Sequence, residues 1–196
     1  AGGALSTGRY YLAGAGTSTA ALSFGGWTGS ASAVTESYNG TSWASGGNLN
    51  TARNSFAGCG SSASALAISG AAGSSGQGLS TTESYNGTSW VYGTASLTSG
   101  PSGVGQGACG TATNPLVFGG LQAANLAYGA RNSTYVLGLD NYTYQLTSVW
   151  TAGSNLNIGR RGLAGCGTST AALSMAGYDV NYSTVTESYN GTIWTV

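Results

Sequence analysis

The sequence has no histidine and no lysine, and its five arginines are balanced by five acidic residues for a net charge of zero. Without histidine there can be no Ser–His or Cys–His nucleophile and no imidazole ligand for a metal. With so few basic residues the chain cannot neutralise many phosphates, so we predict that it does not bind nucleic acid. It also lacks any run of about 18 apolar residues, so we predict no membrane insertion.

Glycine is abundant and proline is scarce, at 35 and 2 residues. Glycine, serine and threonine are poor residues for helix interiors, so this composition favours short strands joined by turns. Disorder would require few aromatic residues and a high net charge. The chain instead has five tryptophans, twelve tyrosines and three phenylalanines, placed at recurring positions. We therefore predict an all-β folded chain.

Two phrases recur along the chain. "TESYNGTSW" occupies residues 35–43, returns at 82–90 and as "TESYNGTIW" at 186–194, and is degraded to "YTYQLTSVW" at 142–150. The second phrase, "LAGAGTSTAALSFGG" at 12–26, returns in modified form at 56–70, 106–120 and 163–177. The two phrases together form a unit that occurs four times, at spacings in the range of propeller blades.

Each unit predicts four short strands. In the first unit these are residues 10–15, 20–24, 33–38 and 41–45. Asn39-Gly40 stands between the last two and is repeated as Asn86-Gly87 and Asn190-Gly191. Asn-Gly between alternating strands is a strong signal for a tight hairpin.

A glycine doublet after an apolar strand, a Glu-x-Tyr strand, a tryptophan after a turn and then Leu-x-x-x-Arg together resemble the kelch repeat. The residues that carry the resemblance are the doublets Gly25-Gly26 and Gly119-Gly120, the tyrosines Tyr38, Tyr85 and Tyr189, and the tryptophans Trp43, Trp90, Trp150 and Trp194. Two doublets depart from the pattern, as Ser69-Gly70 and Ala176-Gly177. The resemblance implies a kelch-like β-propeller with four antiparallel strands in each blade, and the four repeated units predict a four-bladed one.

We predict one domain over residues 1–196, with blades at about 9–47, 53–95, 101–153 and 160–196 and residues 1–8 at the closure seam. The four blades either close a ring or form a section of a longer array, and we favour the closed ring. The first strand of every unit consists of small residues, as in Ala13-Gly14-Ala15-Gly16. Strands beside a narrow axis need small side chains, which is the reason for favouring closure.

The cysteines and most of the charges repeat with the units. One position of the unit holds a cysteine in three copies, as Cys59, Cys109 and Cys166. These cysteines lack the paired spacing of a disulfide or zinc site, so we expect buried free thiols rather than a metal site on the axis. Arginines at 9, 53 and 160 and glutamates at 36, 83 and 187 recur, while the third unit lacks both. This joint loss favours a structural Arg–Glu pair in each remaining blade over a sialidase-like arginine cluster.

Catalytic chemistry has few residues left to use. Once the repeated glutamates are set aside, only Asp140 and Asp179 remain for the pair of carboxylates that glycosidases need. No G-x-x-x-x-G-K-[ST] phosphate loop occurs. We predict that the protein is not an enzyme, with no catalytic residue, no metal and no cofactor.

The loops between the second and third strands differ most among the units, at residues 27–32, 71–80, 121–134 and 178–184. Variable loops on one face of a repeat fold often form its binding face. The predicted ligand-binding residues in these loops are Trp27, Tyr128, Arg131, Tyr178, Asp179 and Tyr182. Exposed aromatic residues beside polar groups suit sugar rings or a protein partner, although they could instead only cover the end of the ring.

Two functions remain open. The first is a non-enzymatic recognition module, extracellular or on a virion surface, that binds a cell-surface glycan or a receptor through these loops. The second is a structural or decoration building block of a larger assembly, such as a phage fibre, tail or capsid, with protein partners and no small ligand. Kelch-like proteins of tailed phages and marine bacterial surfaces have a similar charge-poor style, so the virion setting is an analogy.

Overall fold

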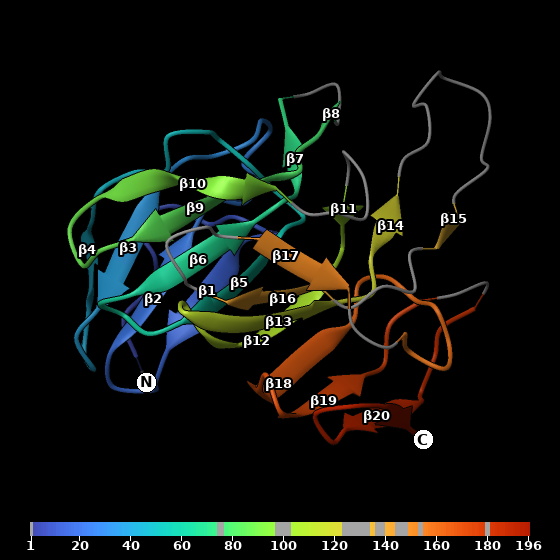
Figure 1. Ribbon diagram of the computed structural model, residues 1–196. Helices are drawn as coiled ribbons and strands as arrows, with labels where there is room; N and C mark the ends of the chain where they lie inside the picture. Colours follow the sequence, from blue (N-terminus) through green and yellow to red (C-terminus); the bar gives the residue numbers. More distant parts are fainter. Residues whose placement is uncertain are drawn as a thin grey trace.

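The computed structural model describes residues 2–73, 77–96, 103–122, 134–135, 140–143, 149–152, 155–178 and 181–196. Throughout these ranges the chain is all-β, and its strands form four main sheets of four strands each (Figure 1). No helix in these ranges is long and apolar enough to cross a membrane. The predicted all-β fold with antiparallel four-stranded sheets is confirmed.

The first sheet shows the plan that the others follow. Its strands are β1 (Ala13–Gly16), β2 (Ala21–Phe24), β3 (Thr35–Tyr38) and β4 (Trp43–Ser45), paired antiparallel in chain order. β1 begins three residues later than predicted, because Tyr11 has a positive φ of 55° and breaks the strand geometry.

The remaining main sheets repeat this plan. The second consists of β5 (Ala57–Gly60), β6 (Ala65–Ile68), β9 (Thr81–Tyr85) and β10 (Trp90–Ser96). The third consists of β12 (Gly107–Thr111), β13 (Asn114–Phe118), β16 (Asp140–Thr143) and β17 (Val149–Ala152), and the fourth of β18 (Ala164–Thr168), β19 (Ala171–Met175), β20 (Thr186–Tyr189) and β21 (Trp194–Thr195). Short strands β7 (Ala71–Ala72), β8 (Gln77–Gly78), β11 (Gly103–Val104), β14 (Leu121–Gln122) and β15 (Thr134–Tyr135) form two small sheets beside them.

The Asn-Gly hairpins are longer than predicted. Tyr38 pairs with Trp43, so the first loop has four residues and β4 begins at Trp43 instead of Thr41. Gly40 has a φ of 94°, whereas Asn39 is not among the residues with positive φ. The Asn39 Oδ1 instead accepts hydrogen bonds from the N–H groups of Thr41 and Ser42, at 3.0 and 2.9 Å. Asparagine is therefore needed here as a side-chain acceptor that closes the turn.

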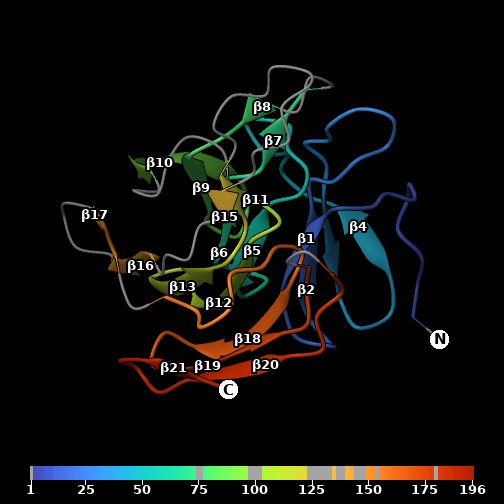
Figure 2. The same ribbon diagram turned by 90° about the vertical axis from the view of Figure 1, so that its right-hand side faces the viewer.

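The four main sheets are arranged about a common axis without closing round it. The strands that begin each sheet, β1, β5, β12 and β18, lie at the centre, and the last strands lie outside (Figure 2). β1 packs against β5, β5 against β12, and β12 against β18. Small residues make this approach possible, because a Cβ added to Gly58 would lie 2.7 Å from the Phe24 ring. The small residues therefore allow neighbouring inner strands to approach closely.

A ladder of main-chain hydrogen bonds links the sheets where they enter the axis. The residues that precede the inner strands donate in turn: Ser55 N to Tyr11 O at 3.0 Å, Gly105 N to Ser55 O at 2.8 Å, and Gly162 N to Gly105 O at 2.7 Å. All four residues have positive φ values, between 54° and 71°. Each sheet is thus fixed to the one before it by its main chain.

Apolar side chains fill each junction between neighbouring sheets. Between the first and second sheets, Leu22 and Phe24 pack against Phe56 and Trp90. Between the third and fourth, Leu116 and Phe118 pack against Leu163 and Trp194. The second junction brings together Leu66, Ile68 and Val117. At all three junctions the front face of one sheet contributes the leucine of its second strand, and in the second and fourth sheets the rear face contributes a tryptophan.

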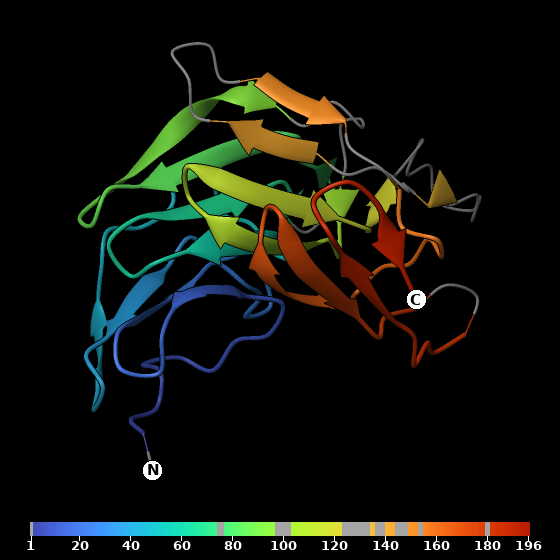
Figure 3. The same cartoon turned by 60° about the horizontal axis from the view of Figure 1, so that its bottom comes forward.

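The predicted closed ring is not observed. No packing comparable to the other three junctions joins β18 to β1, and the sheets that contain the N- and C-termini stand at the two ends of the series (Figure 3). Leu173, on the front of the fourth sheet, is 39% exposed, whereas Leu22, its equivalent in the first sheet, is 2% exposed. Small inner residues therefore show that neighbouring sheets approach closely, but they do not ensure that four sheets complete a circle.

Three buried ion pairs hold the inner strands to their own sheets, as predicted. Arg9 Nη1 lies 2.8 Å from Glu36 Oε1, Arg53 Nη2 lies 2.6 Å from Glu83 Oε1, and Arg160 Nη1 lies 2.7 Å from Glu187 Oε1. The second oxygen of each carboxylate is also satisfied; for Glu83 the donors are the N–H and side-chain amide of Asn50. Burial raises the pKa of Glu36, but hydrogen bonds from Ser6 and Arg9 more than offset this and leave that pKa lowered.

The cysteines follow the prediction in two sheets and depart from it in the fourth. Cys59 and Cys109 are buried free thiols, and burial, with a smaller effect of the neighbouring thiol, raises the pKa of each to about 12. Each lies against the next inner strand, with Cys109 Sγ 3.7 Å from Thr168 O. Cys166 is exposed, since no sheet in the described part of the chain covers the front of the fourth sheet. Within the described ranges no group of three metal-ligand side chains is arranged to hold an ion.

Candidate functional site

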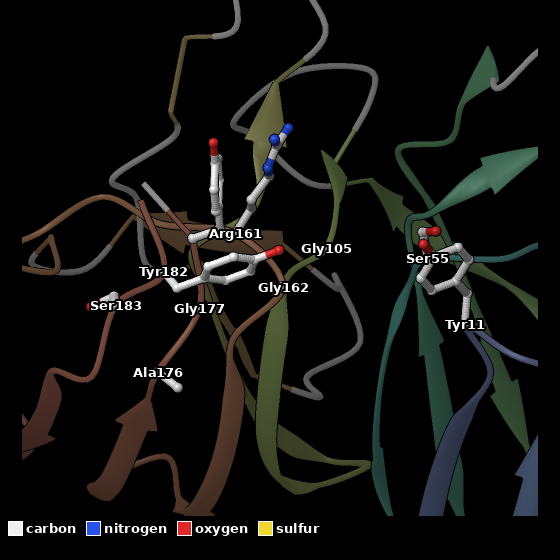
Figure 4. Close-up of a pocket in the computed structure, with 10 residues that line it drawn as sticks. Tyr11, Ser55, Gly105, Arg161, Gly162, Ala176, Gly177, Tyr182 and Ser183 are labelled. Atoms are coloured by element: carbon white, nitrogen blue, oxygen red, sulfur yellow. The ribbon is translucent and has the colours of Figure 1, made fainter. Parts of the chain in front are cut away.

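A hollow of about 540 Å³ opens at the end of the axis where the inner strands begin. The segments that precede the inner strands of all four main sheets contribute to its wall. The lining residues are Tyr11, Ser55, Gly105, Arg161, Gly162, Ala176, Gly177, Tyr178, Tyr182 and Ser183. In Figure 4 Tyr11 and Ser55 stand on one side of the hollow, Arg161, Gly162 and Tyr182 stand on the other, and Gly105 lies between. The site is therefore a shared mouth of the axis rather than a cleft within one sheet.

The main-chain ladder shapes this mouth. Tyr11 and Ser55 adopt left-handed conformations, with φ values of 55° and 54°, where the third and fourth sheets use Gly105 and Gly162. A side chain in this conformation costs about 1–2 kcal/mol relative to a right-handed one. In the first two sheets this strained conformation places the Tyr11 phenol and the Ser55 hydroxyl at the rim of the hollow. The glycines of the other two sheets have no side chain and leave open space there. The variation makes the mouth asymmetric.

Aromatic residues gather on the side of the fourth sheet. Tyr178 pairs with both Arg161 and Tyr182 through isolated β-bridges, which tie the loop to the strand entry. The rings of Tyr178 and Tyr182 are 5.6 Å apart and nearly perpendicular, in an edge-to-face contact. Tyr182 is 92% exposed, so its ring is available to a ligand.

Arg161 supplies the positive charge of this mouth. Its guanidinium carbon lies 5.0 Å from the centre of the Tyr178 ring, a cation–π contact that fixes the side chain. Among the arginines in the described ranges, Arg9, Arg53 and Arg160 each pair with a glutamate, and no such pair is found for Arg161. Since no acceptor for its guanidinium N–H groups is found among the described residues, these donors can bond to oxygen acceptors of a ligand.

The structure places half of the six predicted site residues. Tyr178 and Tyr182 line the hollow. Trp27 lies on the same face, bridged to Tyr10 and Ala31, but it does not line the hollow and is half-buried. Tyr128, Arg131 and Asp179 lie outside the described residues.

Sequence reasoning missed Tyr11, Ser55 and Arg161. All three follow the repeated arginine position within two residues, a stretch that we assigned to strand entry. A signal was present, because this stretch reads Tyr10-Tyr11, Asn54-Ser55 and Arg161-Gly162 beside nearly constant neighbours. Positions that vary between otherwise constant ones are not needed for the common shape, so they are free to contact a ligand.

Comparison with known proteins supports the fold and goes no further. No protein-family model and no curated protein matches the chain. Among solved structures, that of YjhT is similar, with a TM-score of 0.76 and 13% sequence identity over 97% of this chain. The chain spans 65% of the length of that structure. At such low identity the similarity concerns the fold alone.

Proposed function

We propose that this chain is a kelch-like propeller module that recognises a glycan or a protein receptor at the mouth of its axis and catalyses no reaction. Its setting would be extracellular or on a virion surface. The hollow lined by Tyr11, Tyr178, Tyr182 and Arg161 is the observation that carries the proposal. The kelch assignment is supported by the repeated glycine, tyrosine and tryptophan positions and by the four-stranded antiparallel sheets.

The chemistry of the hollow suits a ring-shaped ligand with several oxygens. Tyrosine faces pack against the C–H groups of a sugar ring and leave the hydroxyls at its edge free to bond. Arg161, held over Tyr178, can donate to those hydroxyls. Tyr11, 64% exposed, is available as a second platform across the hollow. A volume of about 540 Å³ is within the range of small-molecule sites.

The absence of catalysis is supported by what surrounds Arg161. The three glutamates are engaged in buried pairs away from the hollow, and no carboxylate is found among the described residues that line it. These described lining residues offer stacking and hydrogen bonds, but no acid–base pair.

A glycan array with the purified chain tests this function. We expect selective sugar binding that is lost in Tyr182→Ala and reduced at least tenfold in Arg161→Gln. Tyr92→Ala is the matched control, because Tyr92 is 58% exposed on the outer strand β10 and does not line the hollow. Binding that is equal in all three variants, or no binding to any glycan or receptor, would refute recognition at this mouth.

The alternative is a building block that joins or decorates a larger assembly without a small ligand. The uncovered front of the fourth sheet favours it, because Leu173 there is exposed where its equivalents are buried. Copurification at fixed stoichiometry with an assembly partner, together with no response on the array, would support this function.

A further inference from the structure

The front face of the fourth sheet is built as a junction, but no described part of the chain packs on it as a neighbouring sheet does. Leu22, Leu66 and Leu116 are 1–3% exposed because the following sheet covers them, whereas the equivalent Leu173 is 39% exposed. A second position on the same face agrees. Thr35 is buried and accepts a hydrogen bond from Trp90 Nε1 of the following sheet at 2.9 Å, whereas Thr186, its equivalent, is exposed.

The rear face of the first sheet lacks a partner in the complementary way. Trp90 and Trp194 are each 4% exposed, because they pack on the preceding sheet. Trp43, the equivalent in the first sheet, is only half-buried. Leu5 and Leu12 are likewise half-buried, although their equivalents in the second and fourth sheets are buried.

The main-chain ladder ends at the same two faces. Gly162 donates to Gly105, but within the described ranges no hydrogen bond reaches its carbonyl oxygen. At the other end Tyr11 accepts from Ser55, and no bond is found from its own N–H. A second ladder behaves in the same way. Gly26 and Gly120 donate to the arginine carbonyl of the next sheet, and no such bond is found from Gly177.

We propose that the space between these faces receives further sheets of the same repeat, which cover Leu173 on one side and Trp43 on the other. The partner is specified by chemistry on both faces. Its rear must present a tryptophan and apolar side chains to the fourth sheet, and its front must present a leucine to the first. Its inner strand must be rich in small residues, with an N–H for the Gly162 carbonyl and a carbonyl for the Tyr11 N–H.

Other occupants fit these faces less well. Within the first and fourth sheets Arg9 is paired with Glu36 and Arg160 with Glu187, so these buried charges offer no free complement to an acidic or a basic partner. A second copy docked front to rear would cover one pair of faces and leave another pair open, because such an interface is heterologous. Inserted sheets satisfy both faces together. The similar structure of YjhT, of which this chain spans 65%, has the additional length that such sheets require.

Thiol labelling measures directly whether a neighbouring sheet covers each inner strand. The three cysteines hold equivalent positions, and the two that a following sheet covers are buried. In the chain as it stands, an aromatic disulfide reagent should react rapidly with Cys166 and slowly with the buried Cys59 and Cys109. The test chain carries one, two or three appended copies of its own residues 49–96, with Cys59→Ala in each copy to keep the thiol count. With the number of copies that fills the space between the fourth and first sheets, Cys166 should react at least about 100-fold more slowly, as a buried group does.

The control extension has the same length but carries Trp90→Arg and Tyr85→Ser in each appended copy, so it cannot fill the junction and should leave Cys166 reactive. Three results would overturn the proposal: Cys166 reactive with every extension; extensions that expose all three thiols; or Cys166 protected in the unextended chain. In the last case, protection that rises with protein concentration indicates a second copy, and protection in a monomer indicates a self-closed ring. Tyr182→Ala should leave the labelling unchanged, so this test is independent of ligand binding.

Discussion

Equivalent leucines should differ in their contribution to stability according to the sheet in which they stand. Leu116 and Leu173 occupy the same position on the second strands of the third and fourth sheets, paired with Cys109 and Cys166. Leu116 is 1% exposed and packs with Phe118 and Trp194, whereas Leu173 is 39% exposed. Replacing each by alanine removes the same atoms, so only the surroundings can produce a difference.

The magnitudes follow from burial. A buried Leu→Ala change costs about 2–5 kcal/mol, because it removes apolar contacts and leaves a cavity. We therefore expect about 3–4 kcal/mol for Leu116→Ala. Truncation of Leu173 loses about six-tenths of a transfer free energy of roughly 2.4 kcal/mol and leaves no closed cavity, so we expect about 1–1.5 kcal/mol.

Urea unfolding followed by tryptophan fluorescence provides the measurement. With a slope of about 2 kcal/mol/M, the midpoint of Leu116→Ala should lie about 1 M below that of Leu173→Ala. Leu66→Ala, in the second sheet, is the control and should behave like Leu116→Ala, because Leu66 is 3% exposed. If Leu173→Ala is as destabilising as the other two, the front of the fourth sheet is covered in solution and the open junction is refuted.

Three further predictions concern the axis, the mouth and the ion pairs. Gly58→Ala should destabilise the chain by about 1–3 kcal/mol in urea unfolding, because the added methyl group would meet Phe24 and Ala13. Gly8→Ala is the control and should be nearly neutral, because its methyl group meets nothing within 4 Å. Equal unfolding midpoints for the two variants would contradict the inner-strand packing. Ser55→Gly should raise the free energy of unfolding by about 1 kcal/mol or less, because glycine relieves the positive φ; a clear loss would mean that the hydroxyl matters more than the backbone. The pKa of Glu36 is lowered in the folded chain, so ionised Glu36 should stabilise the fold fully above pH 4.5, its ordinary pKa, and this stabilisation should disappear as the pH falls through the folded pKa. In acid titrations followed by circular dichroism, Glu36→Gln should make the loss of stability with falling pH less steep. An unchanged profile would count against the ion pair.

The sequence predicted those features that depend on contacts within one repeat. The hairpin strands and the Arg–Glu pairs could be predicted because four copies show which residues change together, as in the third unit where both charges are absent. Closure could not be predicted, because the angle between neighbouring sheets depends on the volumes packed at the whole junction. The exposure of Cys166 could not be predicted either, since burial at that position depends on the following sheet.

The candidate site was only partly predicted, for a related reason. Tyr178 and Tyr182 lie in a loop that visibly differs among the units, so variability indicated them. Arg161 stands directly after a structural arginine, and the sequence gives both the same charge. Only the structure separates them: Arg160 is bonded to Glu187 at 2.7 Å within its sheet, whereas Arg161 packs on Tyr178 at the mouth. A doubled arginine in one copy of a repeat should therefore be examined for division of roles, because the scaffold needs only one of the two.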